Sequence, residues 1–189
     1  YLFGDVGLGK THLMMAIGHY ILDKNINANV VYTSAQQFTE DFFLNTRKDS
    51  SNIEFFYNKY RQADILVVDD IQFLANKNTT QEEFFKLFEY LHEHNKQIII
   101  TSDRRADELE NIMKRLTSRF SWGITVDIKK PDLELRKQIL KKKISFILTD
   151  PNVVSDKALE YIAVNFDNNV RELEGAIRRF VNYCVAFGI

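Results

Sequence analysis

The amino-acid sequence predicts an α/β fold with a five-stranded parallel sheet, followed by a small C-terminal lid of three helices. Short apolar runs rich in Val and Ile alternate with helical patterns, which is typical of parallel strands that helices cover on both faces. After Ile128 only helical patterns remain. We therefore expect a sheet domain over residues 1–128 and a helical lid over residues 129–189.

The strands and helices of the sheet domain alternate in regular order. The expected strands lie at residues 1–3, 30–33, 65–68, 98–101 and 124–128. The helices between them are expected at residues 10–24, 35–47, 53–61, 80–95 and 105–119. Because parallel strands need a long crossover connection, this alternation favours a single sheet built from βαβ units.

The lid begins where the helical pattern takes over. Pro131 opens its first helix, and Ser155 is typical of an N-cap for the second. Asn169, with Glu172 three residues later, resembles a capping box at the start of the third. Pro131 and Pro151 are the only prolines, and both lie at these junctions.

Composition excludes several classes of protein. Hydrophobic residues make up 45% of the 189 residues and the net charge is -1, so the chain has a core but no global basic field to attract nucleic acid. A single cysteine, Cys184, excludes an internal disulfide framework, and no apolar run has membrane-spanning length. We expect a cytoplasmic protein. We also expect an N-terminally truncated fragment, because the first strand starts at residue 1 without a methionine or a polar lead-in.

The sequence GDVGLGKTH matches the phosphate-binding pattern G-x-x-x-x-G-K-[ST], the signature of P-loop NTPases. A predicted strand precedes this loop and a predicted helix follows it, so its main-chain N–H groups and the helix N-terminus can converge on phosphate. Lys10 is expected on the β- and γ-phosphates and Thr11 on Mg²⁺. The nucleotide-binding residues expected here are Gly4, Asp5, Val6, Gly7, Leu8, Gly9, Lys10, Thr11 and His12.

Polar residues follow two further strands of the predicted sheet. Asp69 and Asp70 end a buried apolar strand, so they reach the sheet edge where α/β proteins bind ligands. We expect Asp69 to hold Mg²⁺ through water and Asp70 to lie near the attacking water, although a solvated turn gives the same pattern. Ser102 or Asp103 ends the strand expected between the two phosphate-site strands, and either is a candidate sensor of the γ-phosphate.

The longer motifs resemble the AAA+ ATPase domain of the bacterial replication initiators, the DnaA family. They are GDVGLGKTHLMMAIGHYI, VVDDIQFLANK, TQEEFFKLFEYLHEHNKQIIITSDR, RLTSRFSWG and NVRELEGAIRRF, in the same order along nearly the whole chain. The resemblance implies that the chain binds ATP or ADP with Mg²⁺. It also implies slow hydrolysis used as a switch, and self-association into an ATP-dependent oligomer or filament on origin DNA to promote duplex opening.

The resemblance also assigns three arginines. Arg115 matches the arginine finger that reaches the ATP of a neighbouring subunit, and Arg119, one turn later, matches a second interface arginine. Arg171 matches the sensor arginine of the lid. Without the resemblance, two arginines spaced i,i+4, as Arg115 and Arg119 are, more often form part of a solvated helix surface. Arg171 would likewise be an ordinary exposed arginine in the first turn of a helix. A cation in that turn opposes the helix dipole, which favours a role for Arg171.

Contacts with single-stranded DNA follow from the same resemblance. Residues 35–61 match the insertion that distinguishes initiators, and Phe43, Lys77 and Thr80 fall at DNA-facing positions. Phe43 offers a ring for stacking, although an aromatic residue in a helix is more often core. Thr79 stands where relatives commonly carry a basic residue, which weakens this assignment. Duplex binding and contacts with the replicative helicase machinery would belong to regions outside this chain.

Three other functions remain open from the sequence. A helicase loader shares the P-loop and the arginine finger, but residues 35–61 and the NVRELEGA motif argue against it. A small-molecule kinase would need an acceptor pocket, and a nucleotide-binding scaffold would not need the acidic pair and Arg115. Asp70 is shorter than the glutamate common among AAA+ motors, which suits a slow timer. A variant Asp70→Glu that failed to raise turnover would argue against the timer.

Overall fold

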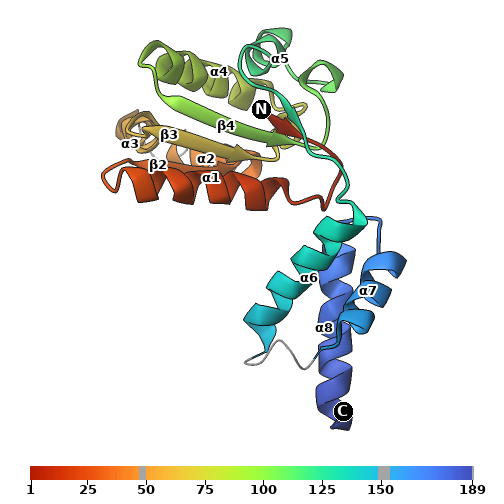
Figure 1. Cartoon of the computed structure of the whole chain (residues 1–189). Coiled ribbons are helices and arrows are strands. Elements are labelled where there is room, and N and C mark those ends of the chain that lie inside the picture. Colours follow the sequence, from red (N-terminus) through yellow and green to blue (C-terminus); the bar gives the residue numbers. More distant parts are fainter. Residues whose placement is uncertain (47–49, 149–153, 189) are drawn as a thin grey trace. The chain divides into compact units, whose positions relative to one another are not determined.

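The computed structural model describes residues 1–46, 50–148 and 154–188 (Figure 1). The last residue of the helix expected at 35–47, and Pro151, lie outside the described residues. The chain divides into two compact units. The first comprises Tyr1–Gly4 and Lys10–Asp127, and the second comprises Asp5–Gly9 together with the chain from Ile128 onward. The division therefore falls after residue 127, whereas the sequence placed it after residue 128.

A five-stranded parallel sheet forms the centre of the first unit, which confirms the predicted fold class. Its strands, in the order β2-β3-β4-β1-β5, are β1 (Leu2–Phe3), β2 (Val30–Ser34), β3 (Ile65–Asp69), β4 (Gln97–Ser102) and β5 (Val126–Asp127). As predicted, β4 lies between β3 and β1. Because all strands are parallel, the carboxyl ends of β1, β3 and β4 meet at one edge of the sheet.

Buried side chains cover the two faces of the sheet. Strand β3 is buried along its whole length, and its residues alternate between two clusters. Leu66 and Val68 pack under the helices α2 (Ala35–Thr46), α3 (Ser50–Arg61), α4 (Asn78–Glu93) and α5 (Lys114–Phe120), whose buried residues share their cluster. Ile65 and Val67 pack with Met14 of helix α1 (Lys10–Lys24), and Figure 1 shows α1 and α4 on opposite sides of the sheet.

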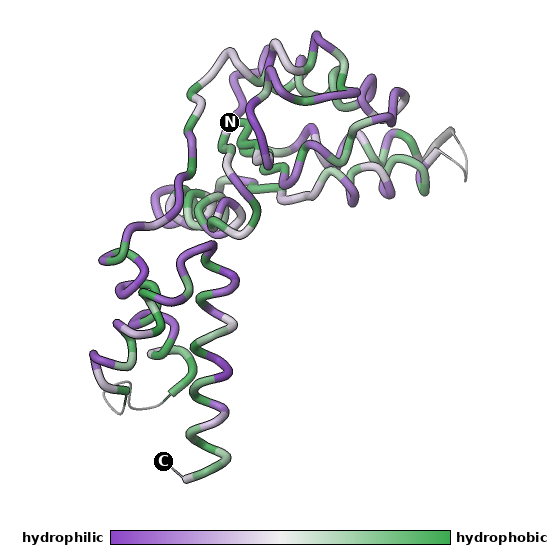
Figure 2. Tube along the Cα trace, turned by 90° about the vertical axis from the view of Figure 1, so that its right-hand side faces the viewer, coloured by the Kyte–Doolittle hydropathy of each residue, from purple (hydrophilic) through white to green (hydrophobic). Residues whose placement is uncertain are grey.

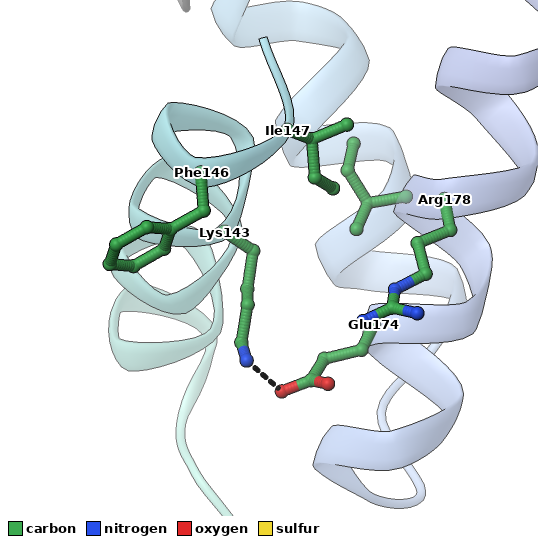
Figure 3. Close-up of a pocket in the computed structure, with 6 residues that line it drawn as sticks. Lys143, Phe146, Ile147, Glu174 and Arg178 are labelled. Atoms are coloured by element: carbon green, nitrogen blue, oxygen red, sulfur yellow. Dashed lines mark ion pairs between the residues drawn. The ribbon is translucent and has the colours of Figure 1, made fainter.

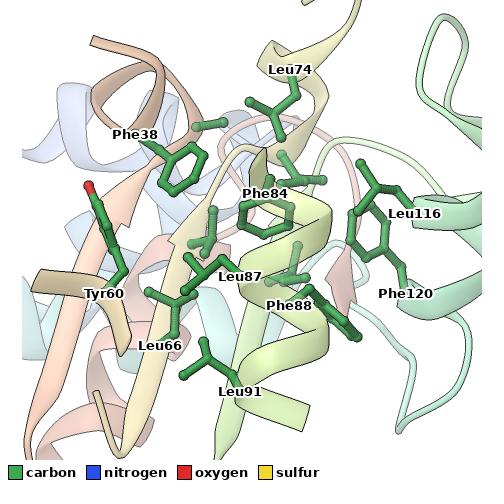
Figure 4. Close-up of a cluster of buried hydrophobic side chains, with 14 of the residues drawn as sticks. Phe38, Tyr60, Leu66, Leu74, Phe84, Leu87, Phe88, Leu91, Leu116 and Phe120 are labelled. Atoms are coloured by element: carbon green, nitrogen blue, oxygen red, sulfur yellow. The ribbon is translucent and has the colours of Figure 1, made fainter. Parts of the chain in front are cut away.

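Aromatic rings form the centre of the larger cluster (Figure 4). The ring of Phe38 contacts those of Phe56, Tyr60 and Phe84, at centroid distances of 5.2, 5.1 and 5.4 Å. Figure 4 shows Phe38, Tyr60 and Phe84 in this cluster. All four side chains are fully or almost fully buried. Edge-on contacts of this kind add to the apolar area that the rings remove from water. The insertion carrying Phe38, Phe56 and Tyr60 therefore belongs to the core of the first unit.

The prediction of one continuous helix over residues 105–119 is wrong. The structure has a short 3-10 helix, η2 (Ala106–Glu108), then an irregular segment, then α5. The reason is a buried glutamine of α4: the Gln81 side chain donates to the Asn111 carbonyl (2.9 Å) and accepts from the Met113 N–H (2.7 Å). Asn111 also has a left-handed backbone (φ 57°), which ends a helix. These tertiary hydrogen bonds replace the helical ones.

The second unit contains the three predicted helices, α6 (Leu133–Ile147), α7 (Asp156–Asn165) and α8 (Val170–Phe187). Their apolar faces share one core, and the alternation of hydrophobic and hydrophilic segments along α8 is visible in Figure 2. This core contains Leu140, Ile144, Leu159, Ile162, Ala163, Leu173, Ala176, Ile177 and Val181.

Side-chain caps start the three helices of this unit. The N-cap of α6 is Asp132, one residue after Pro131. Ser155 caps α7 as predicted, because its hydroxyl accepts from the Ala158 N–H at 3.3 Å. Asn169 caps α8 and accepts from the Glu172 N–H at 2.9 Å. The predicted capping box is only half formed, since the Glu172 carboxylate accepts from the Asn169 side chain and not from its main chain.

Candidate nucleotide site

The glycine-rich loop connects β1 to α1 and requires glycine at two positions. Gly7 and Gly9 have φ of +82° and +97°, which residues with a Cβ rarely adopt. A Cβ on Gly7 would also lie only 3.0 Å from the Asn169 side chain, whereas the space around Gly9 is open. The Gly7 carbonyl accepts from the Val170 N–H (2.9 Å), a first-turn donor of α8 without a partner in its own helix.

Lys10 begins α1 and is buried, with 7% of its surface exposed. Its ammonium donates to the Gly4 carbonyl at 2.8 Å, so the side chain turns back to the start of the loop. A buried ammonium needs polar or charged partners, and the Gly4 carbonyl is one of them. Lys10 therefore contacts the loop that the sequence predicts to bind phosphate.

Asp69 is held by three hydroxyl groups at the end of β3. Thr11 donates to its Oδ2 atom at 2.8 Å, Tyr32 donates to the same atom at 3.2 Å, and Thr101 donates to Oδ1. The carboxylate is buried, and these hydrogen bonds offset the loss of water around its charge. Burial, and then the charge and hydrogen bond of Asp69, raise the pKa of Tyr32 to about 12, so Tyr32 stays a donor. Thr11 and Asp69, which the sequence separately predicts to hold Mg²⁺, thus contact each other directly.

Asp70 leaves the strand in a left-handed conformation, with φ 54° and ψ 57°. Its N–H donates to the Thr101 hydroxyl at 2.9 Å, and its Oδ1 atom accepts from the Gln72 side chain at 3.0 Å. Gln72 belongs to the 3-10 helix η1 (Ile71–Leu74) that follows. A non-glycine residue in this region stores roughly 1 kcal/mol or more of backbone strain, and such residues concentrate at functional sites.

Two residues at the end of β4 were predicted as sensors, and the structure distinguishes them. Ser102 is fully buried, and its hydroxyl accepts from the Arg104 N–H at 3.3 Å. Asp103 is partly exposed and pairs with Arg104 through two hydrogen bonds of 2.9 and 2.7 Å. These hydrogen bonds lower the pKa of Asp103 below its ordinary value. Asp103 is therefore the residue of the two that can meet a ligand.

Three residues of this site, Tyr32, Gln72 and Thr101, were not predicted from the sequence. Thr101 lies one residue before the end of β4, where its hydroxyl meets Asp69, and the sequence indicated only that it belongs to a strand. Gln72 lies two residues after Asp70, and its position in the DDIQF motif is the one sequence feature that could have indicated its place in the site. The Tyr32 side chain is on the exposed side of β2, and no local sequence pattern predicts that its hydroxyl bonds Asp69.

The two arginines of α5 have different surroundings. Arg119 pairs with Glu89 through hydrogen bonds of 2.6 and 3.1 Å, and its guanidinium lies 3.6 Å from the centre of the Trp122 ring. Arg115 is more exposed, 3.8 Å from the Glu82 carboxylate and 4.5 Å from the centre of the Phe85 ring. Within the described chain neither forms a hydrogen bond or ion pair with the loop or with the acidic pair. The Arg115 side chain, which has fewer close contacts, can therefore change its conformation more easily than that of Arg119.

Arg171 lies in the first turn of α8 and its side chain is exposed. Among the described residues it has no hydrogen bond or ion pair to a side chain. The same helix end carries Val170, whose N–H bonds the loop at Gly7. The second unit therefore places an uncommitted guanidinium one residue from a loop contact.

The three residues expected to face DNA also differ. Phe43 is 42% exposed, while its neighbour Phe42 is the buried ring, so the core interpretation applies to Phe42. Lys77 is half-buried at the N-cap of α4. Thr80 is fully buried and its hydroxyl has no partner, so the expectation that this side chain faces DNA is wrong for the structure described here. Thr79, which departs from relatives, is the exposed threonine.

A groove of about 220 Å³ lies between α6 and α8 of the second unit (Figure 3). The ammonium of Lys143 and the carboxylate of Glu174 pair across it at 2.8 Å. Its other lining residues are Phe146, Ile147, Ile177 and Arg178. None of the nucleotide-site residues lines this groove.

No cluster of three or more His, Cys, Asp or Glu residues in the described chain has the geometry of a metal site. Mg²⁺ is often bound by one or two carboxylates together with phosphates, and the oxygen atoms of Asp69 and Thr11 lie close enough together to take part in such a site. In the same ranges, no helix is long and apolar enough to cross a bilayer.

Comparison with known proteins settles the family. Residues 1–127 match the family described as the bacterial DnaA ATPase domain. The chain belongs to this family. The chromosomal replication initiator protein DnaA of Acholeplasma laidlawii is 50% identical over 190 residues, which are 100% of this chain and 42% of that protein. The predicted resemblance is confirmed, and the helicase-loader and kinase interpretations are not needed.

Solved structures give the same result. Domain III of DnaA from Thermotoga maritima matches with a TM-score of 0.92 and 36% identity, over 99% of this chain and 76% of that one. A replication initiator DnaA bound to AMPPCP and single-stranded DNA matches with a TM-score of 0.80 and 38% identity, over 94% and 53%. The AAA+ fold is therefore confirmed. The chain spans less than half of the length of the curated relative above.

Proposed function

We propose that this chain binds ATP with Mg²⁺, hydrolyses it slowly, and thereby controls the assembly of a replication initiator on origin DNA. One observation carries the proposal. The Thr11 hydroxyl and the Asp69 carboxylate, 58 residues apart in the sequence, meet at 2.8 Å beside the glycine-rich loop. This is the hydroxyl–carboxylate pair by which P-loop proteins hold Mg²⁺.

The side chains present fit a magnesium ion and a triphosphate. Mg²⁺ prefers oxygen ligands and keeps several waters, and Thr11 with Asp69 offers two oxygen donors. When bound, the ion neutralises phosphate charge. Lys10 exchanges the Gly4 carbonyl for phosphate oxygens, and the main-chain N–H groups of the loop bind the phosphates. Thr11 and Asp69 would hold the ion, and the hydrogen bonds from Tyr32 and Thr101 would keep the Asp69 carboxylate in place.

Hydrolysis requires a group that orients the attacking water. Asp70 is assigned this role, since its carboxylate follows Asp69 at the same sheet edge, and Asp103 is assigned the sensing of the γ-phosphate. A short carboxylate holds the water less well than a glutamate, which favours slow turnover and a timing role. We expect Asp70→Glu to raise the turnover rate, and an unchanged rate would argue against the timing role.

Assembly requires residues that act beyond one subunit. Arg115 is assigned to the neighbour's ATP, Arg119 to the same interface and Arg171 to the ATP of its own subunit. The DNA-bound structure described above belongs to a relative. For this chain we propose Phe43 and Lys77 as single-strand contacts, because both side chains reach the surface. Duplex binding, helicase contacts and cytoplasmic location remain part of this proposal.

The proposal is tested first by ATP binding. The affinity of the chain for ATP is measured by titration in the presence of Mg²⁺, alongside Lys10→Ala. Lys24→Ala is the matched control, since it removes an exposed lysine from the last turn of the same helix. We expect a loss of affinity of about 100-fold for Lys10→Ala, because a charged hydrogen bond to phosphate is removed, and none for Lys24→Ala.

The control also covers a failure of folding. Far-UV circular dichroism and thermal unfolding of both variants show whether Lys10→Ala remains folded. Wild-type affinity in a folded Lys10→Ala, or an equal loss in Lys24→Ala, would contradict the site assignment.

A further inference from the structure

Gln72 joins the two polar strand ends of the site through one amide group. Its Nε2 atom donates to Asp70 Oδ1 at 3.0 Å, and its Oε1 atom accepts from the main-chain N–H of Asp103 at a longer 3.4 Å. The two partners lie 33 residues apart, after β3 and after β4. Gln72 is therefore a direct side-chain link between the residue assigned to the attacking water and the residue assigned to the γ-phosphate.

The chemistry of the two partners fixes the orientation of the amide. A carboxylate can only accept and a main-chain N–H can only donate, so the Gln72 nitrogen must face Asp70 and its oxygen must face Asp103. Glutamate lacks the donor, methionine lacks both groups, and asparagine is one methylene shorter. Among side chains of this length, only glutamine makes both hydrogen bonds.

The link holds a strained residue in a defined position. Asp70 is left-handed (φ 54°), and it is held from the main chain by Thr101 and from the side chain by Gln72. Gln72 occupies only one carboxylate oxygen, and no hydrogen bond within the described chain engages Oδ2 of Asp70. This leaves one oxygen for a water molecule.

The Asp103 carboxylate does not compete for Gln72. Both of its oxygens accept from Arg104, at 2.9 and 2.7 Å. Gln72 therefore bonds the main-chain N–H of Asp103 and not its carboxylate. A shift of Asp103 toward a bound phosphate would move this N–H and, through the Gln72 amide, the carboxylate of Asp70.

We propose that Gln72 is a positioning residue for ATP hydrolysis, which orients Asp70 and couples it to Asp103. This inference rests on the proposed function, because it assumes that the site hydrolyses ATP. Gln72 acts through Asp70 and does not bind the nucleotide itself. Its loss should therefore lower kcat and leave the ATP affinity unchanged.

The first test is a set of rate measurements on the whole chain. We expect Gln72→Met to lower kcat about tenfold or more, since it removes a hydrogen bond to a charged group, with little change in KM and in the Kd for ATP. Gln72→Glu should lower kcat at least as much, because two carboxylates then face each other. Gln62→Met is the matched control, since the Gln62 side chain is exposed and makes no hydrogen bond in the described chain.

A double-mutant cycle separates positioning from a general structural role. If Gln72 acts only through Asp70, adding Gln72→Met to Asp70→Asn should not lower kcat further. A Gln72→Met variant with wild-type kcat would overturn the proposal. So would a loss that is fully additive with Asp70→Asn, or one that appears in KM and Kd instead of kcat.

A second readout does not depend on turnover. The amide resonance of Asp103 in a ¹H–¹⁵N spectrum should move in Gln72→Met, which loses the acceptor, and stay in place in the control Gln62→Met. An unmoved resonance in Gln72→Met would refute the coupling. A wild-type chain that binds ATP without hydrolysing it would count against the proposed function alone, and the amide readout would still decide the link.

Discussion

Thr101 is expected to be the most sensitive single hydroxyl of the site. It is fully buried, donates to the Asp69 carboxylate and accepts from the Asp70 N–H at 2.9 Å. Valine has nearly the same shape, so Thr101→Val opens no cavity and changes only the hydrogen bonds. It removes one donor from a buried charge and leaves one buried N–H without an acceptor.

The magnitude follows from these two losses. A hydrogen bond to a charged group contributes about 1.5–3 kcal/mol, and an unpaired N–H costs about 1–3 kcal/mol. Tyr32 and Thr11 still bind Asp69, and the valine side chain is easier to bury than a hydroxyl, so we expect a net loss of about 2–4 kcal/mol.

Thr33→Val, on strand β2 of the same sheet, is the matched control. Thr33 is equally buried, but its hydroxyl meets only neutral partners, the Ser34 carbonyl at 3.2 Å and the Tyr60 hydroxyl at 3.4 Å. A neutral hydrogen bond contributes about 1 kcal/mol, so this variant should lose about 1 kcal/mol or less.

Urea unfolding, followed by tryptophan fluorescence and by far-UV circular dichroism, measures both variants. The single tryptophan, Trp122, lies in the same unit as Thr101 and reports on that unit. A Thr101→Val loss below about 1 kcal/mol, or one no larger than that of Thr33→Val, would refute the argument that Thr101 satisfies a buried charge.

Three further outcomes follow from the same structure. Arg119→Ala should lower the free energy of unfolding by about 1–2 kcal/mol and Arg115→Ala by less than about 0.5 kcal/mol in urea unfolding, because only Arg119 has a close ion pair and ring contact. Gln81→Leu should lower it by about 2–4 kcal/mol and speed amide exchange at residues 109–113, and unchanged exchange there would contradict its role. Because the pKa of Asp103 is lowered in the folded protein, its ionised carboxylate stabilises the fold at any pH above its unfolded pKa of about 3.9. This stabilisation is lost as the pH falls through the folded pKa. Asp103→Asn should therefore make the free energy of unfolding fall less steeply on the acid side of its pH curve.

Local sequence patterns predicted the elements that depend on local chemistry. The strands follow from runs of Val and Ile, and the caps at Ser155 and Asn169 follow from side chains that bond their own helix. The loop follows from glycines at positive φ, and the place of β4 follows from the order of the βαβ units. Each of these can be read without knowing what lies across the sheet.

The predictions that were wrong or missing concern positions whose structure depends on residues far away in the sequence. The helix expected at 105–119 is interrupted because Gln81, on another helix, captures its main-chain groups. Thr80 is buried because α4 turns that side chain into the protein, and Thr79 outward. Tyr32 and Thr101 bond Asp69 only because three strands meet at one sheet edge. A hydroxyl contact of this kind has no local sequence signal.

The position of Asp70 shows how these levels combine. Successive side chains of a strand point to opposite faces, so in an extended β3 the carboxylates of Asp69 and Asp70 would diverge. The left-handed turn at Asp70 ends the strand and changes the direction in which its carboxylate points. Because that turn is strained, it persists only where other groups hold it, and Thr101 and Gln72 supply those contacts from β4 and η1. Two adjacent acids can then take the two roles proposed for them, with Asp69 buried toward the proposed metal ion and Asp70 partly exposed toward water. The residues that separate them, Thr101 and Gln72, are those that the local pattern did not reveal.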